Sequence, residues 1–250
     1  MISTKDWQAF VDRLAAIDRE AAASVRRWVE INGLDDIPAL IRYAYRIATK
    51  YGEASAALSA AMYDAIAELS GKYYEPAELA DTATFEETAI AVNGTLKKSQ
   101  NYEMLAGAVS RLVKLAGADT ILRNAKRDGA QYAWIPLGDT CAYCLMLAAK
   151  GWQDDYGDDE HAEHIHSNCN CTYSVRFTPQ GGVEGYTPEK YKRIYLNADL
   201  DGQAPTEENR LNAMRRMFYK KNKEEINAQK RSAYEKRKEL ESSAAEEMNV

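Results

Sequence analysis

The architecture of the N-terminal half follows from residues 5–31, "KDWQAFVDRLAAIDREAAASVRRWVEI". Apolar side chains recur there every three or four residues, at Trp7, Phe10, Leu14, Ile17, Ala21, Val25 and Trp28. This spacing aligns them on one face of an α-helix, and most charged residues fall on the other face. Ser3 or Thr4 is suited to cap the start of the helix. The segment is therefore predicted to be an amphipathic helix that packs against other helices.

Three more helices are predicted before residue 130. Pro38 at a first helical position starts one that runs to about Leu69, with a stripe at Leu40, Ala44, Ile47, Tyr51, Ala54, Leu58, Ala61 and Ala65. Residues 71–87 are expected to form a loop, because Gly71 and Pro76 interrupt helices. Helices at 84–98 and 101–126 follow, the second with an apolar face at Leu105, Val109, Leu112 and Ala116. Residues 1–130 are thus predicted to be a helical bundle domain, and no catalytic constellation is found in it.

Composition limits the class of protein. The chain has 250 residues, of which 46% are hydrophobic, and this is enough for a substantial core. Neither a signal peptide nor an apolar stretch of about 18 residues is found, so we expect a soluble protein made in a cytosol. Thiols stay reduced in that compartment. Clustered cysteines are therefore expected to bind a metal or to act in catalysis.

All four cysteines and all three histidines lie between positions 141 and 171. Cys141-x-x-Cys144 forms one pair, and "HSNCNC" supplies His166, Cys169 and Cys171. Structural zinc sites usually combine two such short-spaced pairs in a tetrahedron. We predict a structural Zn²⁺ held by Cys141, Cys144, His166 and either Cys169 or Cys171, with an all-cysteine set as the second choice.

Four other chemistries are less well supported by the pattern. A redox pair at Cys141 and Cys144 lacks the surrounding βαβ pattern, and a zinc deaminase would need its H-x-E element before the cysteines. A His/Asn-type metal nuclease is suggested by "EHIHSN", but one ligand and two loop histidines explain the same residues. The acidic loop "QDDYGDDEHAEH", residues 153–164, lacks the ligand order of a calcium-binding EF-hand.

The second half of the chain divides into two parts. Short strands are predicted at residues 132–135 and 171–177, with a short helix between them. Residues 131–178 are thus expected to form a small α+β module with few large apolar residues, in which zinc replaces a hydrophobic core. Residues 179–250 are predicted to be a linker and helical arm. The overall prediction is a mainly α protein with an N-terminal bundle domain, a zinc-stapled module and a long C-terminal helix.

The arm is basic although the chain is acidic. From Arg210 to Lys238 there are 11 Lys and Arg against three Glu, a net charge of +8, whereas the rest of the chain carries −14. A helix with so few apolar residues is marginal alone. It is expected to be either a solvated tail or an arm that contacts packaged DNA or an acidic partner.

The stretch "DTCAYC" followed by "HSNCNC" and a strand resembles the C-terminal signature of the phage minor head protein family, typified by the F protein of phage Mu. "YGEASAALSAAMYDA" in the helical half is also similar to minor capsid proteins of tailed phages. Ser167 and Asn170 stand where that family usually has proline and arginine. The resemblance covers about residues 1–180 and includes the candidate ligands.

This resemblance implies a structural virion protein rather than an enzyme. A minor capsid or head morphogenesis protein would be associated with the portal inside the head, and would contact the portal or the major capsid protein. The basic arm from Arg210 to Lys238 would then be free to contact packaged DNA. A second hypothesis is a zinc-dependent nucleic-acid-binding protein, which would bind DNA alone and with sequence preference.

Overall fold

The computed structural model describes residues 1–99, 101–137, 140–156, 165 and 171–247. Those residues form a mainly helical protein with one two-stranded sheet, which confirms the predicted fold class at that level. The elements are α1 (Thr4–Asn32), α2 (Ile37–Glu68), α3 (Phe85–Lys98), α4 (Tyr102–Asp128), β1 (Gln131–Ile135), α5 (Ala142–Lys150), β2 (Thr172–Arg176), α6 (Pro188–Leu196) and α7 (Glu207–Glu247).

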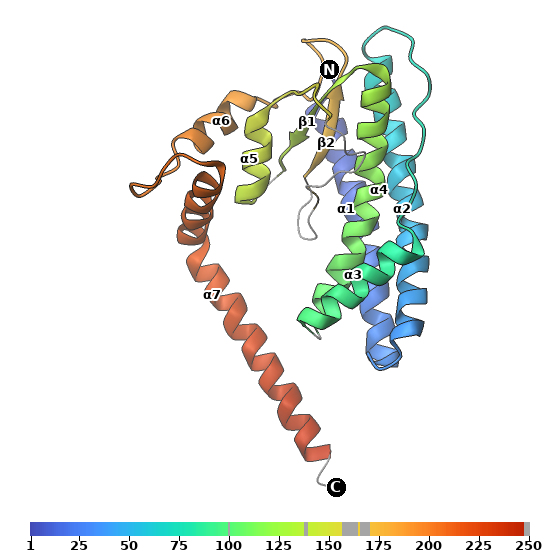
Figure 1. Ribbon diagram of the computed structural model, residues 1–250, viewed down its shortest axis with the longest axis vertical. Coiled ribbons are helices and arrows are strands. Elements are labelled where there is room, and N and C mark those ends of the chain that lie inside the picture. Colours follow the sequence, from blue (N-terminus) through green and yellow to red (C-terminus); the bar gives the residue numbers. More distant parts are fainter. Residues whose placement is uncertain (100, 138–139, 157–164, 166–170, 248–250) are drawn as a thin grey trace.

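Helices α1, α2 and α4 form a bundle, and α3 crosses its lower half in Figure 1. Capping side chains define where these helices begin. Ser3 caps α1 by accepting a hydrogen bond from the amide of Asp6, and Thr84 with Glu87 forms a capping box at the start of α3. Gly129 ends α4 with a φ of 62°, a conformation that glycine adopts without steric cost.

The predicted buried stripe of α2 is correct in its first half and wrong in its second. Ala54 and Ala61 are exposed, and the buried face continues instead through Ser55 and Ser59. The predicted stripe repeated every 3.5 residues, and such a repeat drifts by about 20° per heptad on a straight helix. Small residues at the true contact let α4 approach closely, since a Cβ at Gly117 would lie 2.5 Å from the Ser55 hydroxyl oxygen.

The sheet packs against the bundle. Strands β1 and β2 are antiparallel, with Gln131 opposite Arg176 and Ile135 opposite Thr172. The main hydrophobic core combines apolar side chains of the sheet and α5 with others from α1, α2 and α4: Trp134, Met146, Leu147, Tyr173 and Val175 with Trp7, Phe10, Tyr63 and Ile121. The expectation that the 131–178 module has few large apolar residues is therefore wrong. One core spans both sides of residue 130, and the predicted domain boundaries stay predictions.

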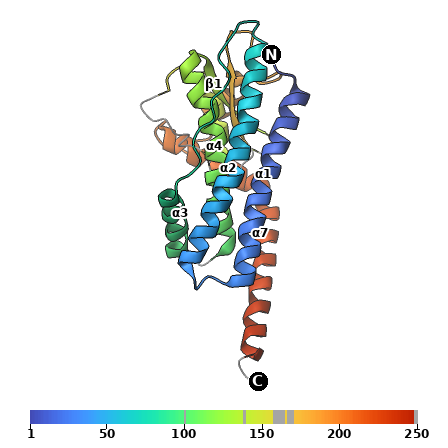
Figure 2. The same ribbon diagram turned by 90° about the vertical axis from the view of Figure 1, so that its right-hand side faces the viewer.

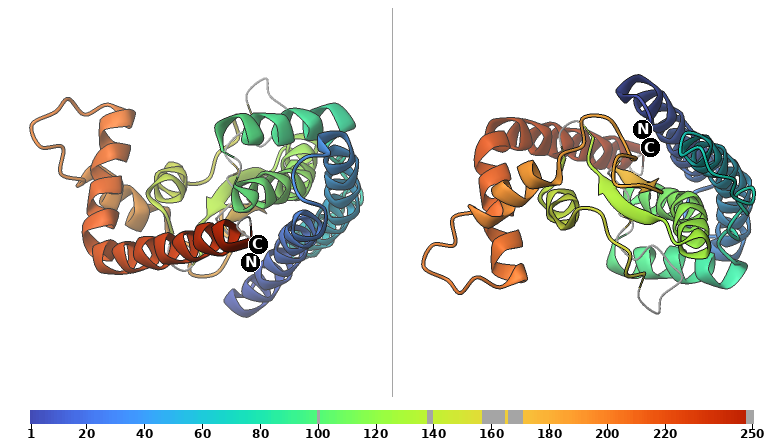
Figure 3. Two further views of the ribbon diagram at one scale, coloured as in Figure 1. Left: turned by 90° about the horizontal axis from the view of Figure 1, so that it is seen from below. Right: turned by 90° about the horizontal axis from the view of Figure 1, so that it is seen from above.

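Helix α5 joins this body to the C-terminal helices. Its residues Cys144, Met146 and Leu147 belong to the main core, whereas Ala142 and Leu145 pack with Met214 of α7 in a second cluster that α6 borders. Seen along the long axis, α6 and the start of α7 lie on the opposite side of the sheet from α2 (Figure 3). The arm thus begins on the helix that carries the first cysteine pair.

Beyond its first turns α7 leaves the body. It is one continuous helix of 41 residues, about 60 Å long at 1.5 Å per residue. It extends past the lower end of the bundle (Figures 1 and 2). Within the described part of the chain, no helix combines the length and the apolar character needed to cross a bilayer.

Candidate functional site

The first cysteine pair lies at the N-terminus of α5. Cys141 is the N-cap residue, and its Sγ accepts a hydrogen bond from the amide of Cys144 at 3.5 Å. Cys144 is buried and Cys141 is half-buried. A helix N-terminus stabilises negative charge, which suits sulfur atoms that bind a cation as thiolates.

The second cysteine segment reaches the same end of the sheet. Cys171 directly precedes β2, is buried, and its Sγ accepts a hydrogen bond from the amide of Leu137 at 3.4 Å. Because Thr172 pairs with Ile135, this sulfur faces the connection that leads from β1 to Cys141. The antiparallel register therefore brings together two segments that are 30 positions apart in the sequence, and amide donors to sulfur are what a thiolate site needs.

Two predicted ligands, His166 and Cys169, lie outside the described residues, as do His161 and His164. Within the described ranges, no group of three or more His, Cys, Asp or Glu side chains could hold a metal ion. The described cysteines thus do not form a site by themselves. The zinc site, and the choice between Cys169 and Cys171, stay predictions.

Both flanks of the undescribed 166–170 stretch contact the bundle. Ile165 is buried in the main core, and Arg111 of α4 donates a hydrogen bond from Nε to its carbonyl oxygen at 2.7 Å. Ile165 and Cys171 also line one small internal cavity of about 20 Å³, together with residues of α1, α2 and α4. Helix α4 therefore holds Ile165, and Ile165 and Cys171, the described residues on either side of this stretch, line the same cavity.

A buried ion pair borders the same cavity. Asp18 of α1 and Lys114 of α4 are 3.5 Å apart, with only about a tenth of each side chain exposed. Burial raises the pKa of Asp18 from 3.8 to about 6, because desolvation outweighs the opposing charge of Lys114. The pair also lines a groove of about 630 Å³ between α1 and α4. Nothing in the sequence pattern marked it, since Asp18 falls between apolar positions of an ordinary amphipathic helix.

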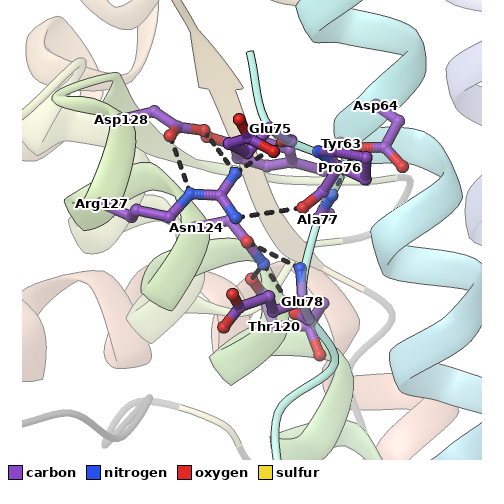
Figure 4. A network of polar contacts seen from close by, with 10 residues as sticks. All are labelled: Tyr63, Asp64, Glu75, Pro76, Ala77, Glu78, Thr120, Asn124, Arg127 and Asp128. Atoms are coloured by element: carbon purple, nitrogen blue, oxygen red, sulfur yellow. Dashed lines mark hydrogen bonds and ion pairs between the residues drawn. The ribbon is translucent and has the colours of Figure 1, made fainter.

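The connection between α2 and α3 contains an extended segment, residues 75–80, which we call the strap. Side chains of α4 bind its backbone (Figure 4). The amide group of Asn124 accepts from the Glu78 amide at 2.9 Å and donates to the Glu78 carbonyl at 2.8 Å. Thr120 accepts from the Ala80 amide at 3.1 Å. Asn124 is fully buried, so the strap backbone replaces water as its partner.

Charged residues hold the start of the strap. Arg127 donates to the carbonyl oxygens of Glu75 and Pro76 at 2.7 and 3.0 Å, and Asp128 orients its guanidinium at 2.8 Å (Figure 4). Burial alone would raise the pKa of Asp128, but hydrogen bonds from Arg127 and Tyr63 hold that pKa below its usual range. The sequence analysis missed these residues. The sequence feature that could have revealed them is the helical spacing of Thr120, Asn124 and Arg127, which places them on one face of α4.

The fold is that of an elongated helical protein with a small sheet, and the described cysteines lie near one end of this sheet. The last helix projects as a basic arm. The profile of the VG15 protein family matches residues 1–198, so the chain belongs to this family of viral proteins. The match ends before α7, which begins at Glu207. Comparisons with curated proteins and with solved structures return no match.

Proposed function

We propose that the protein is a structural component of a tailed phage particle: a minor capsid or head morphogenesis protein that associates with the portal inside the head. The observation that carries this proposal is the viral family match over most of the chain. The resemblance of "DTCAYC" and "HSNCNC" to the Mu F-like minor head proteins supports it. A structural role needs shape, stability and docking surfaces rather than a catalytic centre, and we propose no enzymatic activity.

Within this role, a structural Zn²⁺ would join the two cysteine segments. Cys141, Cys144 and Cys171 supply sulfur atoms near one end of the sheet, two of them with amide donors. Cys169 is two positions from Cys171 in the sequence. Since the sheet and α5 share the main core with the bundle, metal loss should loosen the start of α5 and the 136–140 connection and leave the bundle folded.

The arm is proposed to contact a protein surface. Met217 and Tyr219 are 46% and 44% exposed beside Lys220 and Lys221, a mixture of apolar and basic side chains that suits an acidic protein surface with its own apolar residues. Contact with packaged DNA is the competing proposal. It requires DNA binding by the purified chain that weakens steeply with salt and is lost on truncation after Pro205.

The virion proposal is tested by co-expression with the portal and major capsid proteins of the same virus. The chain should sediment with portal-containing assemblies in a density gradient, and it should leave those fractions when the portal protein is omitted from the co-expression. Sedimentation away from both partners, together with sequence-selective DNA binding by the isolated chain, would instead support a zinc-dependent nucleic-acid-binding protein.

The zinc proposal is tested by elemental analysis of the purified protein. We expect about one Zn²⁺ per chain, and loss of the metal in Cys141→Ser, Cys144→Ser and His166→Gln. His161→Gln and His164→Gln are matched controls, since both lie within five positions of His166 in the sequence and neither is a predicted ligand. Metal-free protein from zinc-supplemented expression, or equal zinc content in the ligand and control variants, would reject the site.

A further inference from the structure

The distal part of α7 lies outside the hydrophobic clusters of the described residues. Among the side chains of α7 whose exposure is described, Ala213 and Met214 near its start are buried, where the helix packs on α5 and α6. Farther along, Met217, Tyr219 and Tyr234 are between 44% and 60% exposed. A solvated helix with so few apolar contacts is marginal alone, whereas burial of these side chains against a second surface would stabilise it.

A complementary surface lies on the other side of the bundle. From Glu53 to Glu87 the chain has eight Asp and Glu against the single Lys72. We call the exposed part of this segment, residues 68–87, the strap face. It also exposes four large apolar side chains: Leu69 at 54%, Tyr73 at 83%, Leu79 at 50% and Phe85 at 49%. The strap face thus mixes acidic and apolar side chains, and α7 mixes basic and apolar side chains.

The strap face is ordered before any partner arrives. Arg127 and Asn124 bind the backbone of Glu75 and Glu78, and this leaves both carboxylate side chains exposed. A surface fixed by its own protein loses little conformational entropy on binding. The strap therefore fits the role of a preorganised receptor rather than that of a flexible loop.

A chain cannot pair its own arm with its own strap face in this structure. The start of α7 lies beyond the sheet from α2, and the arm then runs down past the lower end of the bundle, whereas the strap lies along the outer side of α2 and α4 (Figures 1 and 3). We propose that the α7 arm of one copy docks on the strap face of a second copy. Two different surfaces meet in such a contact, so it is heterologous and builds a ring or an open chain of copies.

Sedimentation velocity of the full-length purified chain tests this proposal without any other viral protein. The native chain should associate with increasing concentration, and association should weaken at high salt because the contact is partly ionic. Charge reversal on the arm, K220E/K221E/K223E, and on the strap face, E75K/E78K/E86K, should each give monomers. Combining the two sets in one chain should restore association, which also shows that each set leaves the fold intact.

A mixing experiment separates this contact from any symmetric one. In a mixture of the arm variant and the strap variant, the native arm can pair with the native strap face and the reversed arm with the reversed strap face. The two variants should therefore assemble together beyond 1:1 pairs, whereas a symmetric arm–arm or strap–strap contact would stop at pairs. The control E20K/E30K/D35K changes three exposed acids on α1 and the turn after it and should associate like the native chain. A native chain that stays monomeric, a strap variant that assembles normally, or an arm that binds only DNA would each overturn the proposal. Failure here would leave portal association, tested separately, unaffected.

Discussion

Replacement of Asn124 by leucine tests the strap most directly. The two side chains have the same number and branching of heavy atoms, so the change removes polar groups without opening a cavity. Asn124 makes three hydrogen bonds of 2.7 to 2.9 Å: two with the Glu78 backbone and one with the Thr120 carbonyl oxygen. The variant therefore loses both contacts that hold the middle of the strap against α4.

The magnitude follows from these contacts. Each of the two hydrogen bonds to Glu78 contributes about 1 kcal/mol net, and a partner left unsatisfied in a partly buried position costs about 1 kcal/mol more. Leucine regains some free energy by burying apolar surface. The free energy of unfolding should thus fall by about 2 to 3 kcal/mol in Asn124→Leu. Thr120→Val, which removes one hydrogen bond to Ala80, should cost about 1 kcal/mol.

Urea unfolding measures the loss of stability, and hydrogen exchange measures the loosening of the strap. Amide protons of the strap should exchange much faster in Asn124→Leu, whereas those of α1 should change little. Thr95→Val is the matched control, since the Thr95 hydroxyl bonds only to its own helix, at Ala91, and its loss should change stability by less than about 0.5 kcal/mol. If Asn124→Leu loses no more stability than this control and keeps the strap amides protected, the strap is not held as described.

The remaining predictions concern the bundle. Gly117→Ala should destabilise the protein by about 1 to 3 kcal/mol, because its Cβ would crowd the Ser55 and Ser59 hydroxyls, whereas Gly94→Ala, with open space around it, should stabilise α3 by about 0.5 to 1 kcal/mol. Thermal unfolding of both variants checks this. A change in stability of the same sign in both variants would refute it. Because burial raises the pKa of Asp18 from 3.8 to about 6, its contribution to stability is present below 3.8 and is lost, by up to about 3 kcal/mol, as pH rises through 6. Asp18→Asn should remove that slope in urea titrations between pH 3.5 and 7, and an unchanged slope would contradict it.

Much of the fold could be predicted from sequence because its local signals agree. Apolar spacing located α1 and α4 to within a few residues, and "DGAQYAWIPL" together with "CTYSVRF" placed the strands on either side of the cysteine segments. The stripe of α2 failed beyond Tyr51. There the contact with α4 is made by Ser55, Ser59 and Gly117, whose side chains are too small to be recognised as core positions.

The candidate site could be predicted only in part from the sequence, for a different reason. Spacing alone selected Cys141 and Cys144 as candidate ligands, and the structure adds that Cys171 of the second cysteine segment lies beside Leu137. The clamp on the strap could not be predicted, because it depends on the backbone of a loop about 45 positions away from Asn124. The helical spacing of Thr120, Asn124 and Arg127 shows that they share one face of α4, but it does not show which backbone they bind.

The central claim is that the protein is part of the particle, and its copy number in purified virions is the most direct measurement. Quantitative mass spectrometry should find the chain in washed, DNA-filled particles, in a fixed ratio to the portal protein and at far lower abundance than the major capsid protein. A chain that is plentiful in infected cells but absent from such particles would contradict the account.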